Sequence, residues 1–171
     1  NNKKFHINGN ITEAKDSMLY LENISLNGPV KIDSVKLGED GAFDFQENAM
    51  DSITPDFYRL RIANQTINLS IDSTETVTVK AAYPQMSYKY EVEGSENCNT
   101  IKELSLKQML LQSNINGIVK NPNIGVDSVD VIVTRMLNEY KQDVKTNYIF
   151  KAPMQASSYY ALFQTIQLGN T

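Results

Sequence analysis

Residues 58–71 read YRLRIANQTINLSI, and this stretch decides the fold. A period of two is typical of a β-strand with one buried face, and the Ala-Asn-Gln segment in the middle supplies turn residues. The stretch therefore predicts two short strands joined by a turn. Apolar residues occupy every second position of the two runs: Tyr58, Leu60, Ile62, Ile67, Leu69 and Ile71.

The same alternation continues on both sides, so about eight short strands fill residues 1–94. The phase slips at Asp33-Ser34, as a bulge requires. No helical period occurs before Gly94, and parallel strands need a crossover helix, so we predict an antiparallel sandwich or barrel. The remaining apolar positions of the pattern are Phe5, Ile7, Leu19, Leu21, Val30, Ile32, Val35, Leu37, Phe43, Phe45, Val77, Val79, Tyr88, Tyr90 and Val92.

Residues 95–171 change to the period of a helix. The first helix has Ser95, Asn97 or Asn99 as its cap and ends before Pro122. A second helix follows the loop, and its cap is one of two residues, Asp127 or Ser128. A third begins at Pro153 and ends at Gly169. The sequence thus predicts an α+β protein, with a β-sandwich domain over 1–94 and a three-helix segment over 95–171.

Composition excludes several classes of function. The net charge is −4 and the only adjacent cations are Lys3 and Lys4, which argues against nucleic acid as a partner. With 41% hydrophobic and 21% charged residues the chain is of the ordinary globular type. No apolar stretch is long enough to cross a bilayer, and the residues from Asn1 to Lys4 lack the apolar segment of a signal peptide.

Groups that could carry chemistry are few. The chain has one cysteine, Cys98, with no CxxC partner, and one histidine, His6, which strand alternation turns away from the face of Phe5 and Ile7. Glycine-rich phosphate loops are absent. We therefore expect no catalytic, cofactor-binding or metal-binding residues and no cofactor. Paired carboxylates stay open as an alternative, because such pairs meet in space and leave no spacing signature.

The most concentrated aromatic feature lies in the expected third helix. Tyr160 points away from the face that its neighbours share, so this helix has two apolar sides and needs two partners. We expect its shared face to contact another domain or a second copy of the chain. The residues of that face are Tyr159, Leu162, Phe163 and Ile166.

A set of short motifs, taken in order, resembles a known leader module. This is the domain of unknown function that precedes the thioredoxin-like domain, of peroxiredoxin and thiol-disulfide interchange type, in envelope lipoproteins of Gram-negative anaerobes. The segment from Pro153 to Ile166 is similar to the helical stretch that leads into that domain. The other motifs are Phe5-His6-Ile7-Asn8-Gly9, Leu19-Tyr20-Leu21, Gly28-Pro29-Val30-Lys31-Ile32-Asp33-Ser34-Val35, Gly41-Ala42-Phe43-Asp44-Phe45, Phe57-Tyr58-Arg59-Leu60 and Glu93-Gly94-Ser95-Glu96-Asn97.

The resemblance implies a non-catalytic accessory or spacer module whose partner is a thioredoxin-like domain in cis. It also implies a periplasmic or membrane-anchored place in a Gram-negative cell envelope, with the lipid anchor removed from the N-terminus. The Trp-Cys-x-x-Cys site of such a domain is missing, since the chain has no tryptophan. The end at Thr171 favours a chain cut before that domain over a natural short relative.

Two other functions compete with this reading. The sandwich could be an independent binding domain for a glycan or a peptide, with Tyr83, Tyr88 or Tyr90 as exposed aromatic contacts. It could also be an enzyme that uses its carboxylates or Cys98, which the scarcity of catalytic groups disfavours.

Overall fold

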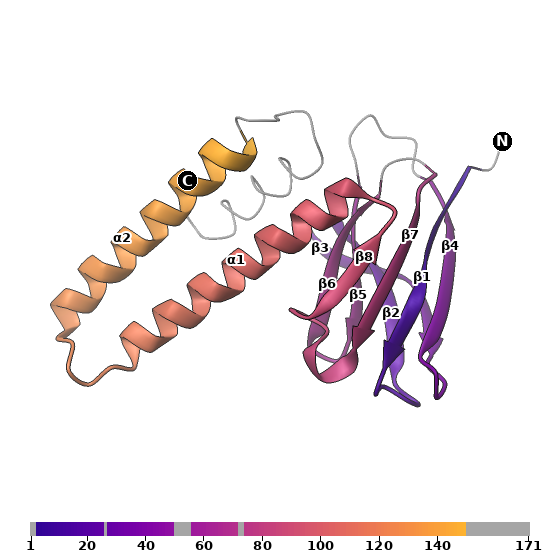
Figure 1. Ribbon diagram of the computed structural model, residues 1–171, viewed down its shortest axis with the longest axis horizontal. Helices are drawn as coiled ribbons and strands as arrows, with labels where there is room; N and C mark the ends of the chain where they lie inside the picture. The colour runs from indigo at the N-terminus through magenta and orange to yellow at the C-terminus, as the bar shows by residue number, and fades with distance from the viewer. Residues whose placement is uncertain (1–2, 26, 50–55, 72–73, 150–171) are drawn as a thin grey trace. The chain divides into compact units, whose positions relative to one another are not determined.

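The computed structural model describes residues 3–25, 27–49, 56–71 and 74–149. In these residues eight β-strands come first and two α-helices follow (Figure 1). The chain divides into two units, Asn1–Lys102 and Glu103–Thr171, and each is described here by itself.

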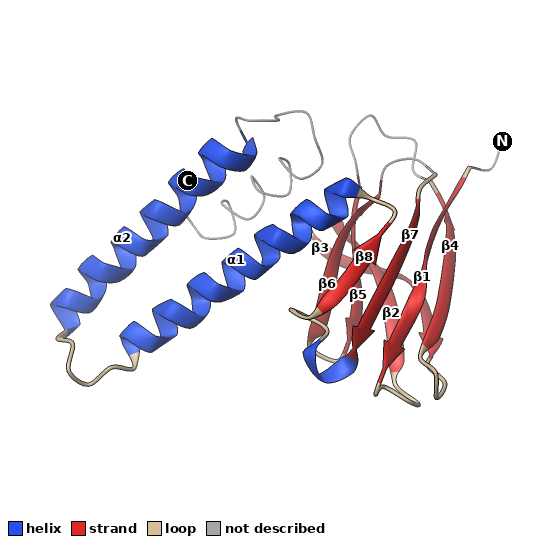
Figure 2. Ribbon diagram, viewed as in Figure 1, coloured by secondary structure: helices blue, strands red, loops and turns tan. Residues whose placement is uncertain are grey.

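The strands form two four-stranded sheets, in agreement with the predicted sandwich of about eight strands (Figure 2). The first sheet contains β1 (Lys4–Thr12), β4 (Ala42–Asn48), β7 (Thr76–Ala82) and β8 (Tyr90–Glu93), in the order β4-β1-β7-β8. The second contains β2 (Met18–Ser25), β3 (Gly28–Lys36), β5 (Asp56–Ile62) and β6 (Gln65–Ile71), in the order β3-β2-β5-β6.

One strand pair corrects the prediction of a wholly antiparallel sandwich. β1 and β7 run parallel, with a register from His6 opposite Thr76 to Thr12 opposite Ala82. Between these strands the chain passes through the whole second sheet and through β4. That long route lets β7 return beside β1 in the same direction, so no crossover helix is needed.

The alternating apolar residues fill the space between the two sheets. Phe5 on β1 and Tyr58 on β5 meet across this space, with ring centroids 4.9 Å apart. Because each strand turns every second side chain inward, the outer faces keep the polar residues. The most deeply buried members of this core from the strands are Phe5, Ile7, Ile11, Leu19, Leu21, Leu60, Ile67, Leu69, Val77 and Val79.

A bulge interrupts β3 close to the predicted phase slip. Leu21 pairs with Asp33 but the next residue of β2, Glu22, pairs with Lys31, so Ile32 has no partner on β2. The irregularity therefore falls at Ile32 and not at Asp33-Ser34. As a consequence Asp33 lies opposite an inward-facing leucine, while Glu22 and Lys31 lie together on the outer face.

The first turns of α1 (Glu96–Val119) belong to the sandwich unit. Of the three capping residues that the sequence offers, Ser95 makes the cap, since its Oγ accepts the backbone N–H of Cys98 at 3.2 Å. The thiol of Cys98 donates to the backbone carbonyl of Ser70, on β6, at 3.2 Å. Cys98 and Ile101 are fully buried, so the start of the helix seals this side of the core.

The second unit is built from the rest of α1 and from α2 (Val126–Val144), which ends in one π-helical turn, η2 (Lys145–Ile149). Lys107 Nζ and Asp143 Oδ2 are 2.9 Å apart and join the two helices. Neither Asp127 nor Ser128 caps α2, because its N-cap residue is Gly125, with no side-chain cap. The buried residues of this unit are Leu104, Leu111, Tyr140, Lys141, Val144 and Tyr148.

The prediction of three helices is wrong for the part of the chain that the structure describes. That part contains two α-helices, the single turn η2 and the 3-10 turn η1 (Tyr83–Gln85). The expected third helix, with Tyr159, Leu162, Phe163 and Ile166, lies outside the described residues. The coarser prediction of a β-rich α+β protein agrees with the strands and helices observed.

Gly9 allows β1 to lie close to β7. Its φ is +144°, a conformation that residues with side chains rarely adopt. A Cβ atom at this position would collide with the backbone carbonyl group of Val79. The central strand of the first sheet therefore needs a residue without a side chain here.

Replacing Gly9 by alanine should lower the free energy of unfolding by about 3 kcal/mol, since the added methyl group forces the two strands apart. Gly38→Ala is the matched control, because the nearest atom to a Cβ there is Asp40 Oδ1 at 3.8 Å. Urea denaturation followed by circular dichroism measures both. Equal midpoints for the two variants would contradict the close approach of β1 and β7.

Candidate functional site

A pocket of about 290 Å³ opens between the two sheets at the side where β3 and β4 are the edge strands. It lies within the sandwich unit and receives side chains from five strands. Its size is near the lower end of the range for small-molecule and side-chain sites. The lining residues are Phe5, Asn23, Val30, Ile32, Glu47, Asn48 and Tyr58.

Strand alternation explains why a carboxyl group faces this pocket. Glu47 follows Phe43 and Phe45 at every second position of β4, so it points to the inner side as they do. Asp33 lies opposite Leu21, which is fully buried, and the bulge in β3 fixes that register. The two carboxyl groups, from the edge strands of different sheets, are hydrogen-bonded to each other.

Two carboxyl groups in contact cannot both ionise easily. Burial, followed by the hydrogen bond and the charge of Asp33, raises the pKa of Glu47 from 4.5 to about 7, and the charge of Lys4 partly opposes this rise. Burial and the nearby charge of Asp56 raise the pKa of Tyr58 to about 12, so its phenol is neutral. Near neutral pH Glu47 is therefore only partly ionised.

Apolar side chains form the walls beside this pair. Phe5 and Tyr58 are buried at the inner end, whereas Val30 is 54% exposed and Ile32 is 38% exposed. Exposed apolar residues beside a concave polar site favour a ligand that covers them. The arrangement suits a ligand with an apolar body and a cationic or hydrogen-bond-donating end.

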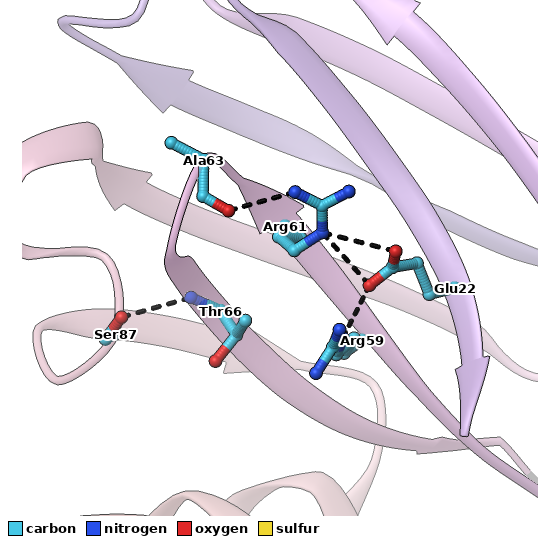
Figure 3. A network of polar contacts seen from close by, with 6 residues as sticks. All are labelled: Glu22, Arg59, Arg61, Ala63, Thr66 and Ser87. Atoms are coloured by element: carbon cyan, nitrogen blue, oxygen red, sulfur yellow. Dashed lines mark hydrogen bonds and ion pairs between the residues drawn. The ribbon is translucent and has the colours of Figure 1, made fainter. Parts of the chain in front are cut away.

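A second polar cluster lies on the outer face of the second sheet, β3-β2-β5-β6 (Figure 3). Glu22 on β2 is 6% exposed, and its carboxylate accepts from Arg59 Nε at 2.5 Å and from Arg61 Nε at 3.2 Å. Burial tends to raise the pKa of Glu22, but the hydrogen bonds and charges of the two arginines outweigh it and hold the pKa below its usual value. Glu22 is therefore an ionised, fully paired carboxylate.

This cluster also anchors the turn between β5 and β6. Arg61 Nη1 donates to the carbonyl of Ala63 at 2.9 Å, and Ala63 has a φ of +52° in that turn (Figure 3). The backbone N–H of Thr66, on β6, donates to Ser87 Oγ at 3.1 Å. Contacts with three separate parts of the sheet identify the network as a brace of the fold.

The residues singled out in the sequence lie apart from the pocket. Cys98 is fully buried, and burial raises the pKa of its thiol, which makes it less reactive. His6 is half-buried on β1, opposite Gln46. Among the described residues no group of three or more His, Cys, Asp and Glu could hold a metal ion.

The three tyrosines proposed as exposed aromatic contacts differ in their exposure to solvent. Tyr88 is 45% exposed and lies in a turn, outside the strand predicted for it. Tyr83 is half-buried and packs against the core, and Tyr90 is 4% exposed. Only Tyr88 of this set is therefore an open aromatic surface, and it lies outside the pocket.

The residues that sequence reasoning missed are Asp33, Glu47 and Glu22. Nothing in their spacing marks them, because their partners come from other strands. One signal was present: Glu47 continues the inward series of Phe43 and Phe45, so the alternation puts a charge at a position where an apolar residue is expected.

Sequence comparison gives the sandwich a family. Residues 5–101 match the family described as "Domain of unknown function (DUF4369)", and this is more than half of the chain. The chain belongs to this family. The matched region spans both sheets and the first turns of α1, and it ends beside the boundary between the two units. No curated protein matches the chain.

Two solved structures that match part of the chain are only distantly similar to it. (S)-allantoin synthase has a TM-score of 0.35 and 10% identity, over 56% of this chain and 45% of that protein. A candidate cell adhesion protein from Bacteroides ovatus has a TM-score of 0.32 and 10% identity, over 56% of this chain and 44% of that protein. The chain thus spans less than half the length of either, and likeness at this level transfers no function.

The helices described here are too short or too polar to cross a lipid bilayer. This holds for α1 and for α2, which are the two long helices in the described part.

The shared proton of Glu47 should make stability depend on pH. Its pKa is raised on folding, so its contribution is full below about pH 4.5 and is lost as the pH rises through 7. Glu47→Gln should remove this dependence and stabilise the protein by about 1 kcal/mol at pH 8, after allowance for solvent screening. Urea unfolding between pH 5 and 8 measures it, with the exposed Asp44→Asn on the same strand as control. An unchanged pH slope in Glu47→Gln would contradict the carboxyl pair.

The contribution of Glu22 to stability should depend on pH in the opposite direction to that of Glu47. Its folded pKa is lowered, so its contribution is present above the unfolded pKa and is lost as the pH falls. Glu22→Gln should cost about 2 kcal/mol at pH 7, because two half-buried guanidinium groups lose their counter-charge. Glu91→Gln, exposed on β8, is the control. Thermal unfolding at pH 7 compares them, and equal midpoints would rule out the bracing role.

Proposed function

We propose that this chain is a non-catalytic accessory module of a thioredoxin-like thiol-disulfide oxidoreductase in a Gram-negative cell envelope, either periplasmic or membrane-anchored. Support comes from the ordered resemblance to the leader module of such lipoproteins. The family match over residues 5–101 covers the same strands that carry most of those motifs. The module would space, orient or supply selectivity to a catalytic domain in cis.

The observation that carries this proposal is the burial of Cys98. It is the one cysteine of the chain, its side chain is fully buried, and its thiol donates to the carbonyl of Ser70. Thiol-disulfide chemistry needs an accessible thiolate, and burial opposes both access and ionisation. Redox chemistry associated with this module therefore belongs to another domain.

The helical unit would supply the connection. On this proposal the face of Tyr159, Leu162, Phe163 and Ile166 contacts the thioredoxin-like domain, and a homodimer contact is the alternative occupant. No cofactor and no nucleic acid take part, and the membrane is reached only through a lipid anchor attached ahead of Asn1.

Two measurements test the accessory role. The chain alone should not reduce insulin with dithiothreitol, and Cys98→Ser should behave identically, because the thiol is sealed. The gene should continue beyond Thr171 into a CxxC-bearing domain, and removing the module from that longer protein should change its substrate selectivity. Turnover by the chain that disappears in Cys98→Ser would overturn the proposal. So would a gene that stops at Thr171 together with the absence of binding to any thioredoxin-like protein.

A second function is favoured by one specific observation, the pocket beside β3 and β4. Its walls include Val30 and Ile32, which are exposed, and its polar lining includes Glu47, whose carboxyl group is hydrogen-bonded to Asp33. On this proposal the sandwich is a binding domain for a glycan or a peptide at the cell envelope. Binding of this kind is compatible with the accessory role, because a module that supplies selectivity must hold a substrate.

A further inference from the structure

Resting on the second proposal, that the pocket is a binding site, we propose that the chain binds an extended peptide along the free edge of β4 and takes a lysine side chain of that peptide into the pocket.

The four sheet edges differ in what they offer to a new strand. On β6 the N–H of Thr66 is already bonded to Ser87, and β3 has Pro29, which lacks an N–H, and the bulge at Ile32. The edge strand β8 has only four residues. In contrast β4 has seven residues without proline or glycine, pairs regularly with β1, and has no other partner among the described strands. Its outer edge is the one best suited to strand addition.

Strand addition at β4 places peptide side chains next to the pocket. Alternate residues of an added strand point to the inner side, as Phe43, Phe45 and Glu47 do. The residue beside Glu47 then faces the exposed walls formed by Val30 and Ile32. Backbone hydrogen bonds would give general affinity, and this one side chain would give specificity.

The chemistry of the pocket selects lysine. A lysine side chain has an apolar stem, which can cover Val30 and Ile32, and an ammonium group with three donors. That group can bind the carboxyl group of Glu47 in the pocket and reach the carboxyl group of its neighbour Asp33. A leucine would add no positive charge to that of Lys4 beside the carboxyl groups, and a glutamate would be repelled. A second copy of β4 would bring its own Glu47 to the same edge, so the charges also disfavour self-pairing.

Binding of the lysine peptide should be coupled to the loss of a proton from Glu47. In the described part of the chain the groups that act on Glu47 are Asp33 from β3, Lys4 from β1 and Tyr58 from β5. The lysine ammonium stabilises the ionised form of both carboxyl groups, so it displaces the proton that Glu47 holds below pH 7. The affinity for the peptide should therefore rise between pH 5.5 and pH 8.

The experiment compares acetylated and amidated hexapeptides of β-forming sequence that differ only at one central residue, which is lysine, norleucine, arginine or glutamate. Amide chemical shifts of the isotope-labelled protein report the place of binding, and titration gives the affinity. We expect shifts along β4 and around the pocket, with lysine at least about tenfold tighter than norleucine and glutamate. Methylation of alternate peptide nitrogens should abolish binding, because it removes the edge hydrogen bonds.

Three variants test which carboxyl groups give the preference for lysine. Glu47→Gln and Asp33→Asn should each weaken the lysine peptide about tenfold and leave the norleucine peptide unchanged. Asp44→Asn, exposed on the same strand, should change neither. The pH dependence of the lysine peptide should be lost in Glu47→Gln, which is expected to fold because its neutral amide resembles the protonated acid.

The outcomes separate this inference from the proposal on which it rests. Equal affinity of the lysine and norleucine peptides, or an arginine peptide that binds about tenfold tighter than lysine, would overturn the assignment of lysine. A glycan that binds from an array and shifts the pocket residues, with no peptide bound, would overturn the peptide and keep the binding site. If neither peptides nor glycans shift these residues, both the inference and the binding function fail.

Discussion

Two sheets that pack face to face bury their inner faces but leave four edge strands. How each of these edges is covered or interrupted determines where the core of this structure is closed. On the side of β6 the helix start and the Ser87 hydroxyl close the core. On the other side a bulge and a proline interrupt β3, and a charge faces inward from β4. The concave site of the molecule lies on the side where closure is incomplete.

Two glutamates, Glu22 on β2 and Glu47 on β4, have opposite electrostatic environments. Glu22 is ionised because two guanidinium groups surround it, whereas burial and the neighbouring carboxyl group of Asp33 raise the pKa of Glu47 to about 7. The bulge at Ile32 sets the register in which Asp33 lies opposite Leu21 and faces inward, whereas strand alternation turns Glu22 outward on β2. The brace therefore depends on the regular pairing of β2 with β5, whereas the acidic pair depends on the register that the bulge gives to β3.

Local pattern predicts most of the strands and of the inward positions, because alternation depends on neighbours in sequence. It fails at Val30, Ile32 and Tyr88, which are exposed. It also offers three caps for the first helix, of which the structure uses Ser95. Local pattern does not predict which strands pair. The parallel pairing of β1 with β7 depends on the route of the chain through the other sheet. The candidate site was hidden for the same reason, since Asp33 and Glu47 meet only across two sheets. Tyr90 belongs to the apolar series of its strand and is buried, so it does not serve as the exposed contact that the alternative binding function offered.

The position of β1 between β4 and β7 affects how the domain is made. The β2-β3 and β5-β6 pairs are formed by strands adjacent in sequence and can close early, with little loss of chain entropy. One edge of β1 has no partner strand until β7 has been synthesised. Such non-local pairing slows folding and leaves the N-terminal strand open to association with other chains, so aggregation risk is greatest in the period before β7 has paired with β1.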